Sequence, residues 1–313
     1  MIIRCEHISK FYGEIQALKD ISFSVDKGEI FGFIGPDGSG KTSLFRILTT
    51  LLVPDKGEAS LDGLDLIRDF RKIRKIVGYM PGKFSLYADL SMEENLEFFA
   101  TVFGTTLEEN YHLIREIYIQ IEPFKKRLAG RLSGGMKQKL ALSCALIHQP
   151  RILILDEPTT GVDAVSRREF WDLLMGLKAK GITILVSTPY MDEAGMCDRV
   201  ALIQKGNLLA MDQPEKIVEN FSRQIYSVHS PRLYQLLKSL RKYPEAESVY
   251  PFGQDLHYTP RENALNRKDL DQYLSNKGHS EYTIRKVRPG IEDVFMSLMQ
   301  QEDGKENQNQ NIY

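Results

Sequence analysis

The stretch Gly35-Pro36-Asp37-Gly38-Ser39-Gly40-Lys41-Thr42 fits the pattern G-x-x-x-x-G-K-[ST], in which backbone N–H groups and a lysine hold phosphate oxygens. The apolar run at 30–34 before it is typical of a buried strand, and residues 43–50 after it predict a helix. The dipole of such a helix points its positive end at the same anion. Lys41 is therefore predicted to reach the β and γ phosphates of a nucleoside triphosphate, and the Thr42 hydroxyl to ligate Mg²⁺.

A second stretch supplies two carboxylates. The apolar run at 152–155 ends in Asp156 and Glu157. A buried strand would carry Asp156 to the carboxyl edge of a sheet, beside the phosphate loop, where it holds Mg²⁺ through water. Glu157 is predicted to polarise the attacking water, which makes Glu157 and Lys41 the candidate catalytic residues. A charged turn after a strand is the alternative, and the accompanying phosphate loop favours the site.

The order of elements predicts an α/β fold with a parallel sheet, because buried strands at 30–34, 151–155 and 183–187 alternate with helices. Residues 84–145 have mostly helical patterns. The pattern changes after about residue 222, which predicts a first domain at 1–222 and a small α+β C-terminal domain at 223–300. The elements expected there are helices at 231–241, 267–276 and 291–299, a hairpin at 252–255 and a strand at 282–287. The polar, Asn/Gln-rich tail at 301–313 is predicted to be disordered.

Further motifs resemble one family. Leu132-Ser133-Gly134-Gly135-Met136-Lys137-Gln138 resembles the signature of ATP-binding cassette (ABC) ATPases, and Gly161-Val162-Asp163 resembles their D-loop. The resemblance covers residues 1 to about 220. It implies a P-loop NTPase core with antiparallel β and helical subdomains, bound ATP and Mg²⁺, and two cassettes that face each other head to tail.

In that arrangement the phosphate loop of one cassette and the signature of the other hold each ATP. The resemblance implies that Tyr12 stacks on the adenine and that Thr42 and Asp156 serve the metal. The implied ATP-binding residues are Tyr12, Gly35, Pro36, Asp37, Gly38, Ser39, Gly40, Lys41, Thr42, Ser43, Asp156, Ser133, Gly134 and Gly135. The alternatives are an ordinary edge aromatic for Tyr12 and a simple helix N-cap for Ser133.

Two positions depart from the family pattern. Gly82 stands where family members usually carry a Gln that touches Mg²⁺ and the attacking water. Pro189 stands where they carry a His that grips the γ-phosphate, and proline offers neither a side-chain donor nor a backbone N–H. We therefore expect this chain's own site to bind ATP and turn it over slowly, while its intact signature completes the site of a second cassette. A heterodimer is favoured; a homodimer and a non-catalytic ATP sensor are the alternatives.

The resemblance is strongest to the ABC-2 exporter class of the drug-efflux type, similar to the daunorubicin-exporter ATPase, on runs such as 162–168 and 190–194. It implies an integral-membrane permease as partner, with a docking groove near Phe84 and Tyr87. The chain would then lie on the cytoplasmic face of the membrane through that permease and serve multidrug efflux.

Composition restricts the other classes. The net charge of −1 over 313 residues argues against nucleic acid as a partner, although a soluble ABC ATPase that acts on nucleic acid or ribosomes remains an alternative. No apolar run approaches the roughly 20 residues of a membrane helix, so direct membrane insertion is not expected. Cys5, Cys144 and Cys197 are scattered, which suits reduced, buried thiols.

Overall fold

The structure, a computed structural model, describes residues 1–83, 85–262 and 264–310, with the backbone alone for 303–310. Its contacts divide the chain into two compact units, Met1–Pro214 and a second that begins at Glu215. Each unit has its own core and is described by itself.

A six-stranded sheet forms the centre of the first unit. Strands β9, β3, β8, β7 and β6 run parallel to one another. Strand β10 pairs antiparallel with β9 at one edge of the sheet. Every residue of β3, β7 and β8 is buried, as their unbroken apolar runs predict for a sheet covered on both faces. In sheet order the strands are β10 (Asn207–Asp212), β9 (Arg199–Gln204), β3 (Ile30–Ile34), β8 (Thr183–Thr188), β7 (Ile152–Asp156) and β6 (Val77–Met80).

An antiparallel sheet lies beside this centre. Its strands, in sheet order, are β2 (Ile15–Val25), β1 (Ile3–Tyr12), β4 (Lys56–Leu61) and β5 (Leu64–Asp65). Together with α1 (Lys41–Leu48) it encloses a core in which Phe23, Phe33 and Phe45 meet edge to face, with ring centroids 4.9 and 5.9 Å apart. Such aromatic contacts add directional packing to the burial itself.

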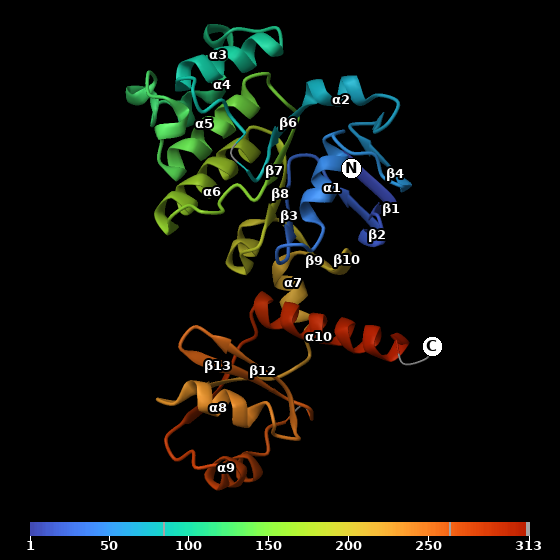
Figure 1. Cartoon of the computed structure of the whole chain (residues 1–313), viewed down its shortest axis with the longest axis vertical. Helices are drawn as coiled ribbons and strands as arrows, with labels where there is room; N and C mark the ends of the chain where they lie inside the picture. The colour runs from blue at the N-terminus through green and yellow to red at the C-terminus, as the bar shows by residue number, and fades with distance from the viewer. Residues whose placement is uncertain (84, 263, 311–313) are drawn as a thin grey trace. The chain divides into compact units, whose positions relative to one another are not determined.

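Helices cover the rest of the first unit. Figure 1 shows α1 on one side of the central strands and α5 and α6 on the other. Ser91 and Thr106 begin α3 and α4 with capping boxes to Glu94 and Glu109, so local sequence sets these helix starts. The other helices of this unit are α2 (Phe70–Ile76), α3 (Met92–Val102), α4 (Leu107–Tyr118), α5 (Gly134–Leu146) and α6 (Ala164–Ala179), with 3₁₀ turns at Glu122–Phe124, Ala129–Arg131 and Met191–Met196. Helix α7 (Pro214–Glu219) begins at the last residue of the first unit and continues into the second.

The second unit is α+β, as predicted. Its antiparallel sheet has the order β12 (Ala246–Phe252), β13 (Asp255–Pro260), β11 (Ile225–His229) and β14 (Thr283–Val287). Helices α8 (Leu233–Leu240), α9 (Arg267–Asn276) and α10 (Ile291–Gln310) accompany it. The expected hairpin forms where Phe252 pairs with Asp255 across Gly253, whose φ of 58° suits a tight turn.

A buried hydrogen-bond network fixes the start of α10. Asp293 is 2% exposed and accepts hydrogen bonds from the Tyr250 hydroxyl, from Nδ1 of His257 and from the backbone N–H of Gly290. Burial opposes the charge of this carboxylate, but the three donors outweigh it and lower its pKa. The network therefore ties α10 to β12 and β13.

Two features of the second unit differ from the sequence prediction. Strand β11 was not predicted, although it pairs with both β13 and β14. Helix α10 continues to Gln310, ten residues into the segment predicted to be disordered, which corrects that prediction for 301–310. Six of these ten residues are Gln, Glu or Lys, which are good helix formers, whereas Asp303, Gly304, Asn307 and Asn309 are poor ones. The helix therefore propagates through a segment of mixed helix propensity. Residues 311–313 lie outside the described part of the chain.

All three cysteines are buried, and burial raises the pKa of each thiol, which confirms them as inert core residues.

Candidate functional site

The phosphate loop joins β3 to α1 and is shaped by close backbone contacts. A Cβ atom at Gly35 would lie 2.1 Å from the carbonyl oxygen of Ile203, and one at Gly40 would lie 2.5 Å from that of Ala17. Gly40 also has a φ of 108°, which only glycine adopts without strain. Because Gly40 gives α1 no side-chain cap, the first N–H groups of α1 are available to an anion. Helix α1 begins at Lys41, two residues earlier than predicted.

Lys41 lies inside this loop. It is 3% exposed, and its Nζ donates hydrogen bonds to the carbonyl oxygens of Gly35 (2.7 Å) and Pro36 (2.9 Å). A third contact is an ion pair with Glu157, whose Oε1 lies 3.3 Å away. A buried ammonium needs such partners, and phosphate oxygens are anionic ligands of the same kind.

The two carboxylates stand where the sequence predicts them. Asp156 ends β7 in register with Ser187 of β8, and the Ser187 hydroxyl donates a 2.6 Å hydrogen bond to Oδ1 of Asp156. The backbone N–H of Glu157 donates to the same hydroxyl oxygen (3.0 Å) and to the Ser187 carbonyl oxygen (3.1 Å). Glu157 itself has a φ of 50°, an uncommon conformation for a residue with a side chain. Burial, and then the negative charge of Asp156, raises the pKa of Tyr79 to about 12.

The two departures lie at the same edge of the sheet. A Cβ atom at Gly82 would lie 3.0 Å from the carbonyl oxygen of Asp156 and 3.7 Å from Cβ of Glu157. Pro189 follows Thr188, whose carbonyl oxygen accepts a hydrogen bond from the N–H of Gly35 (3.2 Å). The structure therefore brings both substituted positions next to the phosphate loop or the carboxylates.

Tyr12 lies beside the loop; the residue is 45% exposed, and its hydroxyl lies 3.3 Å from Oγ of Ser43. An exposed aromatic face at this place suits stacking on a base. Thr42 and Ser43 occupy the first turn of α1 and are partly exposed.

The signature residues lie elsewhere. Ser133 is exposed and caps α5 by accepting a hydrogen bond from the N–H of Met136 (3.3 Å). Cβ atoms at Gly134 and Gly135 would lie 3.3 Å from the carbonyl oxygen of Gly161 and 2.9 Å from Oγ of Ser166. The neighbours of the signature are therefore the D-loop and the start of α6, which Asp163 caps through Val165 and Ser166.

The residues around the phosphate loop are chemically suited to a nucleoside triphosphate with Mg²⁺. The loop offers N–H donors and a buried cation, and Thr42 and Asp156 offer oxygen ligands. Within the described residues no group of three or more His, Cys, Asp or Glu side chains is arranged to hold a metal by itself. Mg²⁺ typically takes one or two protein ligands and completes its shell with phosphate oxygens and water.

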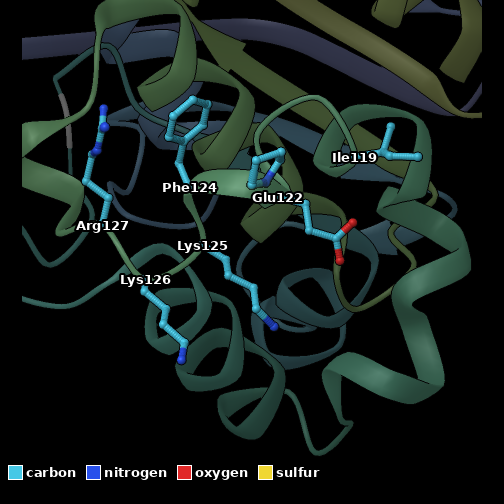
Figure 2. A pocket seen from close by; sticks show the side chains of 7 residues that line it. Ile119, Glu122, Phe124, Lys125, Lys126 and Arg127 are labelled. Carbon is cyan, nitrogen blue, oxygen red and sulfur yellow. The ribbon is translucent and has the colours of Figure 1, made fainter.

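Figure 2 shows a cavity of about 670 Å³ in the helical part of the first unit. Its lining residues all come from the segment that connects α4 to α5: Ile119, Glu122, Pro123, Phe124, Lys125, Lys126 and Arg127. None of these residues belongs to the predicted ATP site.

Comparison with known proteins decides the family. The family model described as "ABC transporter" matches residues 18–160. Nod factor export ATP-binding protein I of Burkholderia lata is 36% identical over 301 residues, which span 93% of this chain and 95% of that protein. This chain belongs to the ABC transporter family.

Other relatives agree. The probable multidrug ABC transporter ATP-binding protein YbhF of Escherichia coli is 36% identical over 288 residues, which span 90% of this chain and 49% of that protein. This chain thus spans about half the length of that relative. Among solved structures, cbiO1 of Clostridium perfringens is 27% identical, covers 70% of this chain and 91% of its own, and has a TM-score of 0.63. The ABC cassette MJ0796, solved as a dimer in a post-hydrolysis state bound to ADP and Pi, is 27% identical, covers 67% of this chain and 98% of its own, and has a TM-score of 0.62.

The described helices of this ABC protein are too short or too polar to cross a bilayer.

Ser187 was not predicted from the sequence, although it is fully buried and its hydroxyl bonds both Asp156 and the backbone N–H of Glu157. The Ser187→Ala variant leaves Oδ1 of Asp156 without its donor, which typically costs about 1–3 kcal/mol. We expect the Mg²⁺ affinity of the ATP-bound chain to fall by about tenfold, with little change in ATP binding in the absence of Mg²⁺. A Mg²⁺ titration of nucleotide binding measures this.

Ser143→Ala is the matched control, because Ser143 is equally buried but donates to the carbonyl oxygen of Lys139 in α5. Equal loss of Mg²⁺ affinity in both variants would mean that Ser187 acts only through general stability.

Proposed function

We propose that this chain is the ATP-binding and ATP-hydrolysing subunit of an ABC exporter whose cargo passes through a separate integral-membrane permease. The proposal rests on one observation: Lys41, Asp156 and Glu157 lie together at the carboxyl edge of the central sheet. The names of the relatives, a multidrug transporter ATP-binding protein and a Nod factor export protein, support export and multidrug efflux in particular. The chain would act on the cytoplasmic face of the membrane through the permease.

Its own ATP site is proposed to be impaired. Bound Mg²⁺ would neutralise charge on the phosphates. Lys41 would hold phosphate oxygens, Asp156 would orient the metal's water, and Glu157 would polarise the attacking water. Gly82 and Pro189 remove two further contacts, and the loss of one preorganised contact typically costs about 2.7–4 kcal/mol. Slow turnover with retained ATP binding follows.

The ion pair between Lys41 and Glu157 gives a reason for retaining Glu157 in such a site. When no phosphate is bound, the Glu157 carboxylate balances the charge of the buried ammonium. Without it, Lys41 would keep only two carbonyl acceptors, and an uncompensated buried charge is costly. Glu157 therefore has a structural role that does not depend on catalysis.

A second cassette is the proposed partner in the dimer. The signature at Ser133–Gly135 is intact, Ser133 and Gly134 are exposed, and the nearest neighbours of its glycines are Gly161 of the D-loop and Ser166 of α6. This placement suits an ATP held by another chain. A heterodimer with a fully equipped cassette is favoured over a homodimer, because two impaired sites would give a weak motor.

The permease is proposed to dock near Tyr87. This side chain is 50% exposed and packs edge to face on Phe98, with ring centroids 4.8 Å apart. Asn95 is fully buried and holds the loop by accepting from the N–H of Tyr87 (3.0 Å) and donating to its carbonyl oxygen (3.0 Å). Tyr87 is therefore a surface aromatic held in a fixed loop, and not a core residue. Phe84, the other predicted anchor, lies outside the described residues.

A non-catalytic ATP sensor is the second candidate, and Gly82 and Pro189 favour it. Titration calorimetry with MgATP tests the ATP site that both candidates require. We expect the parent chain to bind, and Lys41→Ala to weaken binding at least about tenfold, because charge-assisted hydrogen bonds to phosphate are lost. Lys56→Ala, at an exposed lysine of β4, is the control. If the Lys41→Ala variant bound MgATP as tightly as the parent chain, both candidate functions would be contradicted.

A further inference from the structure

We propose that one surface of the first unit, here called the α2 basic face, binds anionic phospholipid headgroups. It consists of Arg68, Arg71 and Lys75 with the apolar side chains of Ile67 and Phe70, and all five residues are exposed. The inference rests on the proposed function in two respects, namely that the chain works at a membrane and that its permease docks near Tyr87.

The charge of this segment is strongly biased. Between Ile67 and Ile76 the sequence has five basic residues and one acidic residue, a local charge of +4, whereas the whole chain carries −1. Within α2 only Ile73 is buried, so a short helix has one residue in the core and its charges outside. Basic clusters of this size on a helix are typical of surfaces that meet anionic lipid.

Apolar side chains accompany the charges. Ile67 is 56% and Phe70 37% exposed. The guanidinium carbons of Arg71 and Arg74 lie 5.6 and 5.2 Å from the centroid of the Phe70 ring. Arg74 is itself fixed to Thr50 by hydrogen bonds of 2.8 and 3.0 Å to its hydroxyl and carbonyl oxygens. The ring and its two cations thus form a preorganised group, in which Phe70 offers apolar contact and the arginines can meet anionic headgroups.

The position of α2 agrees with this ligand. Helix α2 leads directly into β6, the edge strand of the central sheet. Figure 1 shows α2 at the same, upper end of the first unit as α3 and α4, and the loop that carries Tyr87 leads into α3. With a permease docked at that loop, α2 would lie at the permease-facing end of the first unit. Arg71 and Lys75 are four residues apart and so share one face of α2, which a planar headgroup layer can contact together; this favours lipid over an acidic peptide.

Sedimentation of the full chain with vesicles tests the proposal. The vesicles contain phosphatidylglycerol and phosphatidylcholine, or phosphatidylcholine alone, at low and high salt. We expect binding only with phosphatidylglycerol and only at low salt. Each basic side chain near an anionic surface contributes about 1 kcal/mol, or roughly fivefold, so R68Q/R71Q/K75Q should bind roughly 100-fold more weakly.

The control variant is K242Q/K268Q/K277Q, which removes the same charge from three exposed lysines of the second unit. It should bind vesicles as the parent does. Equal loss in both triple variants would overturn the proposal, because net charge alone would then explain binding. Failure of the parent to bind vesicles, with binding of polyglutamate that depends on Arg71, would also overturn it and make an acidic protein segment the ligand. The assay needs no ATP, so a chain that binds ATP but ignores vesicles contradicts this inference and leaves the proposed function intact.

Discussion

In the assembled transporter, Gly135→Asp is expected to lower ATP hydrolysis at the partner cassette's site by about 10²–10³-fold. Gly135 lies in the first turn of α5, where N–H groups and the helix dipole would face the partner's γ-phosphate. A carboxylate at this position would repel the γ-phosphate, and its bulk would keep the N–H groups at the start of α5 from reaching that phosphate. Steady-state phosphate release by the purified complex measures the effect.

Gly135→Ala separates charge from crowding. In both variants a Cβ atom would lie 2.9 Å from Oγ and 3.1 Å from Cβ of Ser166, so both press on the start of α6 equally. We expect the alanine variant to keep most of the activity that the aspartate variant loses. Full activity of the aspartate variant would show that the signature of this chain completes no ATP site.

Pro189→His is expected to raise turnover at this chain's own site by about 10²–10³-fold, the typical contribution of one preorganised donor. The residue before it ends β8 in register with Ile34 of β3, and the N–H of Gly35 donates to its carbonyl oxygen. Position 189 therefore follows directly on the edge where the phosphates would lie. The gain is measured in a complex whose partner site has been inactivated, so that only this site contributes.

Gly82→Gln alone should give a smaller gain. Its Cβ would lie 3.0 Å from the carbonyl oxygen of Asp156, which is closer than ordinary contact, so the loop must move by a few tenths of an ångström. The variant that combines it with Pro189→His tests whether the two losses act together, as contacts within one site often do. If Pro189→His retains ATP binding and still shows no gain, the missing histidine is not what limits this site.

Local sequence was enough to predict the phosphate loop, the buried strands and most of the second unit, because each has its own pattern of glycines or apolar residues. The role of Ser187 was not predictable, because its contact with Asp156 depends on the register of two strands 31 residues apart. Strand β11 was missed for the same reason, since its pairing partners follow much later in the chain. The close approach of Gly82 to the carbonyl oxygen of Asp156 was not predictable either, because it also joins two segments that are distant in the sequence.

The signature shows a different limit of sequence reasoning. The motif at Ser133–Gly135 identified a family, and the cap on α5 confirms its local structure. The ligand of that motif would lie on another chain, so this chain alone contains only half of the interaction.

The central claim is that this chain binds ATP at a site that hydrolyses it poorly. Its most direct test is steady-state MgATP hydrolysis by the purified chain alone, beside its Glu157→Gln variant, with ATP binding measured in the same samples. The account predicts clear binding by both proteins and negligible turnover that hardly changes in the variant. Robust turnover that Glu157→Gln abolishes would contradict it, because Gly82 and Pro189 would then be tolerated and a homodimer would become the leading model.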